Sequence, residues 1–569
     1  MVSYLTPGIY IEEIVATETR PANVWRDDCT ALTAAATEKL DIVPMGTAAF
    51  IGITARAGAA DELLRNPTLV KSWREFVDQF GEDTGPGYLP AAVHGFFANG
   101  GPACIIVSLG LISVDEHGIR LPDLRAHDFM DAINDRAGLG AIRPGHEPGL
   151  LCIPDIMALL QQGALDIEWA HAIQQTMIDY CEYHHNCTAI LDTIPTLKPD
   201  EAHHWRMQFQ YDTSRAVLYY PWLICAAGDG RPARAVPPCG HIAGVMMRTQ
   251  IEHGVQKTPA NEILRDVADL ELHVTRAEQE ILNPVGINLV QATPEGEIRV
   301  WGARTLSSDS AYRLIKTRRV MMTAQRSIER AVSWAIFATL DRPARERICC
   351  TIQQLLHRLW QAGALVGASE ADAYYLVEHL DPDTPSLYVV ETGLALDAPG
   401  VFKRFRVVFF TDDVIPDLAE PEHAAPDYSR DLVDEQPPPD IFVSYSRKDW
   451  DEFVEPLVAS LRENGLSIWV DQHLLQGGQD WMDEINHALK LCRLMILCVS
   501  PDALQSRYVK LEYRQFFNTN KPILPVICHP AELPAELGGI QYLPYAEQDT
   551  LIARARQLLA VDDDPSLPT

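Results

Sequence analysis

The chain has 569 residues, enough for several domains, and its 47% hydrophobic and 22% charged residues are typical of a globular protein. Its formal net charge of −31 repels phosphate backbones and anionic lipid, so neither nucleic acid nor a membrane is expected as a partner. No apolar run is long enough to cross a bilayer, and the N-terminal residues lack the basic and apolar regions of a secretory signal.

The first 410 residues mix strand and helix patterns. Alternating apolar residues after a Pro-Gly turn signal predict an edge strand or arm at residues 6–13. An amphipathic helix is expected from Ser72 to Phe80, where Gly81 ends it. The other expected elements are a strand at 46–54, a helix at 89–99, a strand at 104–107, an apolar segment at 298–303, a long helix with a basic start at 312–337 and a strand at 401–410.

One cluster of metal-ligand types, Cys181, His184, His185 and Cys187, lies where a helical pattern gives way to a strand. Zinc ligands normally come as two spaced pairs, and no second pair is near, so we expect no metal site. A buried thiol and a histidine at a helix end are the preferred interpretation. The 12 cysteines follow no framework spacing, which indicates reduced thiols in a cytoplasmic protein.

Enzyme motifs are missing from this part of the sequence. It contains no G-x-S-x-G elbow, no H-E-x-x-H and no P-loop, and His241 in CGHIAG is expected to serve packing rather than catalysis.

Several longer segments carry a resemblance instead. They are PGIYIEE, SWREFVDQFG, GFFANGGPAC, NPVGIN, VWGARTLSS and RRVMM followed by SIERAVSWAIF. In this order they resemble the tail sheath protein of contractile injection systems and contractile phage tails, over nearly all of residues 1–410.

The resemblance implies an α+β body with strand-exchanging arms. Its parts would be an N-terminal arm and first core part at 1–110, an outer domain at 111–280, and a second core part with a C-terminal arm strand at 281–410. In the sheath family the arms add strands to neighbouring subunits, and the repeated contact builds an open helical tube. The implied partners are further copies of the chain and other tail-like structural proteins.

A linker is expected at residues 411–439. Residues 411–440 hold ten acidic residues, one Arg and six prolines, with no helical or strand period. Proline and charge of one sign both extend a chain, so this stretch separates the body from a C-terminal domain at 440–569.

Strands alternate with helices after the linker. Apolar runs predict strands at 441–445, 466–470, 494–499 and 522–528. The intervening helices are expected at residues 450–461, 481–489 and 508–517. This alternation predicts an open parallel α/β sheet, which binds ligands outside the carboxyl ends of its strands.

Three segments of this domain, DIFVSYSRKD, GLSIWVDQHLLQGGQDWMDEINHAL and LMILCVSPDALQSRYVKLEY, resemble the TIR domain in order and spacing. The resemblance spans residues 440–545 and implies a flavodoxin-like parallel α/β fold. Some TIR domains are adhesive signalling modules, and others hydrolyse NAD+ at the nicotinamide–ribose bond with one glutamate. No glycine-rich phosphate fingerprint of a Rossmann dehydrogenase is present.

The resemblance makes Glu512 the candidate catalytic residue. In enzymatic TIR domains the glutamate follows a pattern like Ser-x-Trp-x-x-x-Glu, which residues 506–512 match with Tyr508 in place of Trp. Nicotinamide in NAD+ is already cationic and leaves neutral, so the second carboxylate of an ordinary glycosidase is not required. One fixed carboxylate beside the ribose would stabilise the oxocarbenium-like transition state.

Further residues are implied as NAD-contacting groups. Tyr445, Ser446 and Arg447 follow the first strand, and Arg447 would pair with a phosphate. Trp469 matches an aromatic residue that packs on the dinucleotide, and Asp471 begins the BB loop, which gates the site and makes TIR–TIR contacts. The alternatives are a core residue for Trp469 and a solvated surface charge for Arg447.

Two functions follow from these resemblances. The first is a sheath-like polymer that carries a TIR NAD+ hydrolase for toxic or anti-phage NAD+ depletion, controlled by assembly, with NAD+ as substrate and no cofactor. The product would be linear or cyclic ADP-ribose. The second is a contractile sheath subunit whose TIR domain is a non-enzymatic interaction module.

The linker gives a first testable prediction. Limited proteolysis should cut first between Asp412 and Pro439 and release two folded pieces, because this stretch has too little apolar surface to bury. Mass spectrometry of the early fragments checks this. Early cuts elsewhere, with this stretch protected, would show that it packs on a domain.

Overall fold

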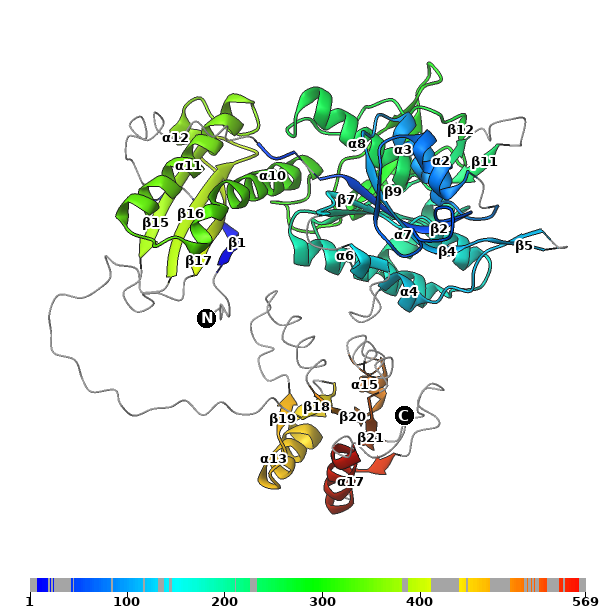
Figure 1. Cartoon of the computed structure of the whole chain (residues 1–569), viewed down its shortest axis with the longest axis vertical. Helices are drawn as coiled ribbons and strands as arrows, with labels where there is room; N and C mark the ends of the chain where they lie inside the picture. The colour runs from blue at the N-terminus through cyan, green and yellow to red at the C-terminus, as the bar shows by residue number, and fades with distance from the viewer. Residues whose placement is uncertain are drawn as a thin grey trace. The chain divides into compact units, whose positions relative to one another are not determined.

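The computed structural model describes residues 8–18, 21, 24, 42–44, 46–82, 85–115, 118–130, 138–142, 146–209, 211–225, 233–380, 387–410, 440–446, 449–470, 492–505, 509, 513, 516, 521–529, 542–545 and 548–561. The chain forms two compact units, Tyr4–Pro421 and a second that contains Glu422–Thr569, here called the body and the C-terminal unit (Figure 1). The division falls inside the acidic, proline-rich segment, whose residues 411–439 lie outside the described part of the chain.

The centre of the body is an eight-stranded sheet. Its strands are β2 (Ala48–Thr54), β3 (Thr68–Val70), β4 (Cys104–Leu111), β7 (Leu150–Cys152), β8 (Thr188–Asp192), β9 (Ala216–Tyr220), β13 (Ile287–Ala292) and β14 (Ile298–Val300). Six are parallel in the spatial order β4-β2-β7-β8-β9-β13, and β3 and β14 are antiparallel at the two edges. In chain order the parallel strands are laid 2-1-3-4-5-6, so the winding reverses between β2 and β7.

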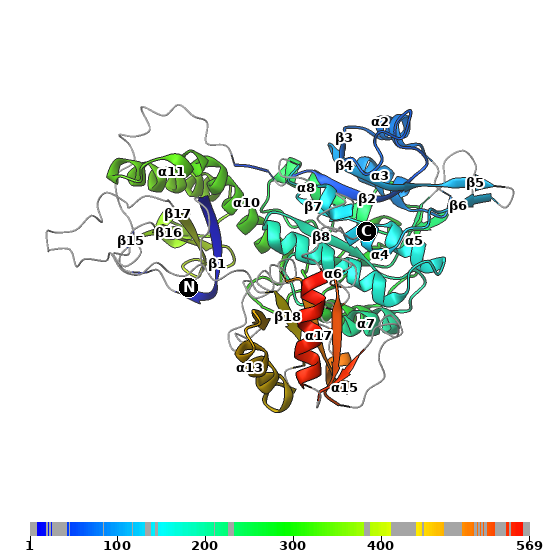
Figure 2. The same cartoon turned by 60° about the horizontal axis from the view of Figure 1, so that its bottom comes forward.

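Helices cover both faces of this sheet, because its central strands are buried on both sides (Figures 1 and 2). One face carries α2 (Trp73–Phe80), α3 (Leu89–Ala98) and α8 (Cys239–His253). The other face carries α4 (Ala126–Met130), α5 (Asp155–Gln161), α6 (Ile167–His184) and α7 (Pro199–Gln208). The predicted boundaries of α2 are confirmed: the Ser72 side chain accepts from the Glu75 amide, and Gly81 ends the helix at φ 81°.

Smaller elements lie around this sheet. They are the hairpin of β5 (Ser113–Asp115) and β6 (Gly118–Arg120), the short sheet of β10 (Leu223–Cys225), β11 (Arg234–Val236) and β12 (Asp269–Leu270), α9 (Arg276–Leu282), and the 3-10 helices η1 (Gly138–Ala141) and η2 (Asn283–Val285). His241 of α8 is buried with its ring against Gly95 of α3, a helix contact that agrees with the expected packing role.

A second, antiparallel sheet completes the body. Its strands lie in the order β1 (Gly8–Glu18), β17 (Phe402–Phe410), β16 (Leu387–Ala395) and β15 (Tyr374–Leu380). The helices beside it are α10 (Ile315–Val332), η3 (Ser333–Phe337), α11 (Arg342–Gln361) and α12 (Glu370–Ala373). The expected edge strand near the N-terminus is therefore confirmed, since β1 pairs only with β17 among the described residues.

The eight-stranded sheet runs across both internal boundaries expected for the body. β4 pairs with β2, and β2 pairs with β7, so residue 110 marks no break between sheets. Near residue 280, β13 joins the same sheet beside β9. Sequence pattern does not show these pairings, because each joins segments dozens of residues apart. The second core part, expected at 281–410, is divided between two sheets. Its strands within residues 287–300 belong to the eight-stranded sheet, and those within residues 374–410 belong to the four-stranded sheet.

The cysteines depart from expectation at one position. Cys350 is disulfide-bonded, whereas ten other cysteines of the described residues are free, so the prediction of reduced thiols is wrong for Cys350. Spacing along a chain does not reveal which thiols a fold brings within bonding distance.

Cys181 and Cys187 are buried, and His185 caps α6 in the left-handed region at φ 54°. Among the described side chains, no group of three or more His, Cys, Asp or Glu is arranged to hold a metal ion.

The C-terminal unit is an open, fully parallel sheet in the described residues. Its strands are β18 (Ile441–Ser444), β19 (Ile468–Val470), β20 (Leu494–Val499), β21 (Ile523–Ile527) and β22 (Leu543–Pro544). They lie in the order β19-β18-β20-β21-β22, which is 2-1-3-4-5 in chain order and confirms the expected flavodoxin-like fold. The first four were predicted, and β22 was not, because two residues carry no periodic signal.

Its described helical segments are the π-helix η6 (Trp450–Val454), α13 (Glu455–Glu463), α15 (Pro501–Gln505) and α17 (Gln548–Val561). The predicted first helix has two parts, a π-helix that ends at Val454 and a regular α-helix that begins at Glu455, with Pro456 in the first turn of the second part. The helix expected at 481–489 lies outside the described residues. No helix of the described parts of either unit is both long and apolar enough to cross a membrane.

Candidate functional site

The strand order of the C-terminal unit fixes where a ligand site can form. β18 is strand one and β20 is strand three, and they are neighbours in register from Ile441 opposite Leu494 to Ser444 opposite Leu497. Crossovers from these two strands run to opposite faces of the sheet, and in this fold ligands bind outside the carboxyl ends of such strands. Tyr445 and Ser446 directly follow β18 and are half-buried at this place.

A buried hydrogen bond joins the turn after β18 to the residue that directly follows β20. Ser500, the residue after β20, donates from Oγ to Oδ2 of Asp449 at 2.6 Å. The same hydroxyl accepts from the Ala503 amide at 3.0 Å and so caps α15. The Asp449 amide donates to the Ser446 carbonyl at 2.8 Å, which closes the turn after β18. Asp449 and Ser500 are 4% and 0% exposed, so water does not compete for this bond.

Asp449 and Ser500 were not among the site residues predicted from the sequence. The available signal was their position, since one follows β20 directly and the other lies five residues after β18. Polar residues just beyond the carboxyl ends of adjacent parallel strands are candidates for contact in this fold. They position the loop that begins with Tyr445 and Ser446 against the helix that follows β20.

Trp469 lies on the edge strand β19 and stacks on Phe442 of β18, with ring centroids 4.8 Å apart and planes at 17°. Trp469 is half-buried, so its core packing is established and part of its surface is open. Tyr445 lies against Trp450, with ring centroids 5.2 Å apart. Trp469 therefore packs beside the middle of β18 in the core on one face of the sheet, and Tyr445, just after the end of β18, packs in the core on the other face.

The two faces of the sheet have separate hydrophobic cores. Phe442 and Trp469 belong to the same cluster as Val509, Tyr513 and Phe516, three buried residues in the segment after β20. All three are helical with spacings of four and three, as the predicted helix at 508–517 requires. These three residues therefore pack on the face of the sheet that carries Trp469.

Four predicted site residues lie outside the described residues: Arg447, Asp471, Tyr508 and Glu512. Of the predicted set, the structure brings together Tyr445 and Ser446 and places Trp469 on the neighbouring strand. The assignment of Glu512 therefore rests on its sequence pattern.

The Cys498 thiol near the end of β20 is not a nucleophile. A hydrogen bond with Cys528, followed by burial, raises the pKa of the Cys498 thiol well above its usual value. A protonated thiol attacks poorly, and Cys498 is fully buried. His529 beyond β21 packs edge-on against Phe453, with ring centroids 4.8 Å apart.

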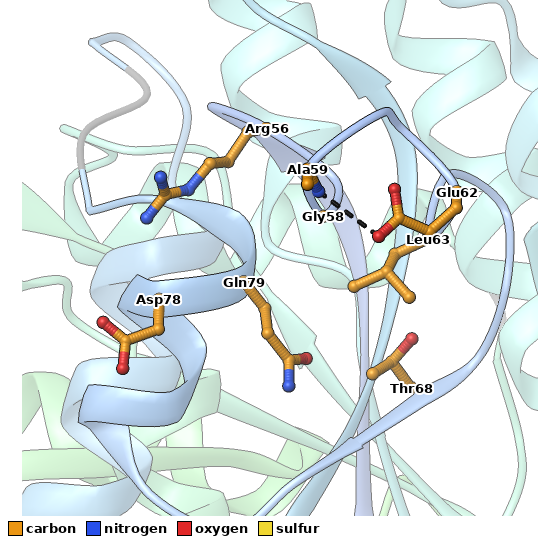
Figure 3. Close-up of a pocket in the computed structure, with 8 residues that line it drawn as sticks. All are labelled: Arg56, Gly58, Ala59, Glu62, Leu63, Thr68, Asp78 and Gln79. Carbon is orange, nitrogen blue, oxygen red and sulfur yellow. Dashed lines mark hydrogen bonds between the residues drawn. The ribbon is translucent and has the colours of Figure 1, made fainter.

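A hollow in the surface of the body, drawn in Figure 3, is a weaker candidate. The guanidinium of Arg56 donates to the Val77 carbonyl at 2.6 Å, and Glu62 accepts from the Ala59 amide at 3.3 Å. These charges hold their own loops, and the eight lining residues include neither His nor Cys. The hollow offers no nucleophile with a base, so we assign it no activity.

The Asp449–Ser500 bond gives a second prediction. Asp449→Ala should lower the free energy of opening of β18 and β20 by about 1–3 kcal/mol, because the buried Ser500 hydroxyl loses its acceptor. Hydrogen exchange of both strands in the full chain measures this, with exposed Glu463→Ala as the matched control. Asp449→Asn retains an acceptor oxygen and should lose less. Equal protection in Asp449→Ala and the control would contradict the assigned role.

Two family models match the chain: the phage tail sheath protein central domain at residues 141–306 and the TIR domain at residues 441–559. The probable 2' cyclic ADP-D-ribose synthase TcpO of Methanobrevibacter olleyae is 30% identical over 91 residues, which are 16% of this chain and 27% of that protein. The NAD(+) hydrolase TcpC of Escherichia coli O6:H1 is 32% identical over 92 residues, which are 15% of this chain and 30% of that protein. The chain thus spans less than a third of the length of either relative.

The body is similar to a solved structure, the helical sheath of the anti-feeding prophage in its contracted state. The two are 25% identical with a TM-score of 0.50, and the match covers 65% of this chain and 94% of that one. Together with the family models and the two sheet topologies, this likeness shows that the chain joins a phage tail sheath body to a C-terminal TIR domain in one polypeptide.

Proposed function

We propose that this chain is a sheath-like, polymerising protein whose TIR domain cleaves NAD+ between nicotinamide and ribose. The observation that carries the proposal is the match of the TIR segment to relatives named as an NAD+ hydrolase and as cyclic ADP-ribose synthases. The strand order supports it, because ligands of this fold bind outside the carboxyl ends of the strands at the place where β18 and β20 are neighbours. The substrate places the activity in the cytoplasm, where depletion of NAD+ would be toxic or would stop a phage.

The chemistry needs few groups. Glu512 stabilises the positive charge that develops on the ribose as neutral nicotinamide departs. Arg447 pairs with a phosphate, Tyr445, Ser446 and Asp471 line the site, and the aromatic rings of Trp469 and Tyr508 bound the dinucleotide. Water that captures the oxocarbenium carbon gives ADP-ribose, whereas a hydroxyl of the same molecule gives a cyclic product. The reaction needs no metal or cofactor.

The second candidate is a contractile sheath subunit whose TIR domain only binds partners. One observation favours it: the Trp469 ring stacks on Phe442 and so already has a role in the core. Incubation of the purified chain with NAD+ and detection of nicotinamide separates the two candidates, because a pure interaction module releases none.

Glu512→Gln should reduce nicotinamide release by about 10²–10³-fold while the fold is kept, because the neutral amide cannot stabilise the oxocarbenium charge. Initial rates of nicotinamide release measure this, and circular dichroism checks the fold. Glu463→Gln, an exposed position on α13, is the matched control and should retain the wild-type rate. Wild-type cleavage by Glu512→Gln would show that another residue carries the reaction.

Assembly should raise the rate of NAD+ cleavage. In enzymatic TIR domains the BB loop of one copy completes the site of the next, and a polymer raises the local concentration of its attached domains. An extended linker of about 30 residues reaches on the order of 90–105 Å, which spans neighbouring copies.

Deletion of residues 1–12 should therefore lower polymer formation and NAD+ cleavage together, since it removes the first half of β1. Sedimentation and nicotinamide release of the truncated and intact chains, at equal concentration, measure the two effects. A truncated chain that stays monomeric and cleaves NAD+ at the full rate would show that the body carries the TIR domain without controlling its activity.

A further inference from the structure

β1 carries a charge where its pattern requires an apolar residue. Successive side chains of a strand point to opposite faces, so Ile9, Ile11 and Glu13 share one face. Ile9 and Ile11 pack on the core between the four-stranded sheet and its helices. Glu13, in register with Phe405 of β17, therefore points inward as well, and its side chain is 22% exposed.

Three side chains converge on the Glu13 carboxylate. Arg318 donates from Nη1 to both oxygens at 2.6 and 2.7 Å, and Arg215 donates from Nη2 at 2.9 Å. Gln325 donates from Nε2 at 3.0 Å. Arg318 and Gln325 lie on α10, whereas Arg215 directly precedes β9 of the eight-stranded sheet. One carboxylate on an edge strand thus bonds to both sheet systems of the body.

Each of the two arginines is buried and also has a contact outside β1. Their side chains are only 5% and 6% exposed. Arg215 also donates to the His185 carbonyl, and the Arg318 guanidinium lies 4.1 Å from the ring centre of Tyr312. Burial, with the charge of Arg215 beside it, lowers the pKa of His185 to about 4, so this imidazole is neutral at pH 7. The site is therefore a buried pair of positive charges whose side chains also contact residues outside β1.

This pair requires a carboxylate. Burial alone would raise the pKa of Glu13, but the charges and hydrogen bonds of Arg318, Arg215 and Gln325 hold it at about 2. If the carboxylate is removed, two buried like charges lose the counter-ion that they share, which is among the costliest changes in a protein. An apolar or amide side chain at this position of the strand cannot replace it.

We propose that Arg215, Arg318 and Gln325 form a carboxylate-specific receptor for β1, and that Glu13 is the residue by which this strand is recognised wherever it docks. The recognised motif is Ile-x-Ile-x-Glu, in which the two isoleucines make apolar contacts and the glutamate supplies the charge. The occupant is the β1 segment of this chain. Residues 19–41, which follow it, reach about 76–83 Å when extended, so a second copy can supply the same strand.

The inference rests on the proposed function only where a second copy in a polymer supplies β1. Recognition of β1 through Glu13 depends only on the contacts described above. The matched control is Glu12, which neighbours Glu13 but points to the opposite face and lies opposite Arg406, whose side chain is 47% exposed.

The first experiment compares hydrogen exchange at residues 8–14 in three full-length chains: wild type, Glu13→Gln and Glu12→Gln. Loss of the charge-assisted bonds in Glu13→Gln should raise the exchange rate of the β1 amides by about tenfold or more. Glu12→Gln should change it by less than about threefold. Wild-type protection in Glu13→Gln overturns the proposal.

The second experiment tests recognition in trans. A fluorescent peptide of residues 6–18 is offered to the full-length Glu13→Gln chain, whose own strand is weakened, and anisotropy measures binding. The natural peptide should bind about thirtyfold or more tightly than the same peptide with Glu13→Gln, and the Glu12→Gln peptide should match the natural one. Equal binding by all three peptides, or no binding by any, overturns the proposal. The nicotinamide assay is independent, so its failure would overturn the enzyme while the recognition result stands.

Discussion

Parallel strands can be joined only by crossover connections, and this constraint fixes where the winding of the sheet reverses in both units. In the body and in the C-terminal unit alike, the parallel strands begin in the spatial order 2-1-3-4-5. The connections after strands one and three therefore run to opposite faces, and the chain must leave a gap outside the carboxyl ends of these two strands. The two units differ in the residues that occupy this place.

In the body the gap is filled from within. Asp155 follows β7, and its carboxylate accepts hydrogen bonds from the amides of Ile53 at the end of β2 and of Tyr88 and Leu89 at the start of α3. A helix N-terminus favours an anion, and here the protein's own carboxylate takes the place of a ligand phosphate. Asp155 is fully buried, and burial raises its pKa to about 6. The same place in the TIR domain keeps Tyr445 and Ser446 half-buried around the Asp449–Ser500 bond.

Local signals predicted much of this fold. Ser72 and Gly81 delimit α2 by capping chemistry, and the run Leu494–Val499 is strand β20, because both depend on neighbours in sequence. The misses depend on partners far along the chain. Glu13 meets Arg318 across 305 positions and Ser500 meets Asp449 across 51, and no period or spacing marks such pairs. The one local trace was the acidic residue at an inward position of β1, two residues beyond Ile11.

Net charge links the polymer to the proposed enzyme. At −31 per chain, copies repel one another, so TIR domains should rarely meet by random collision. Association then needs contacts strong and specific enough to overcome the repulsion. If a second copy supplies β1, as proposed, the pairing of this strand with β17 and the Glu13 carboxylate between two arginines would form such a contact. On this proposal, an acidic chain with one buried positive receptor for β1 would have two separated states, dispersed or assembled through β1. On the proposed function, the enzyme would be silent in the first state because its domains stay apart, and active in the second because the sheath holds them together.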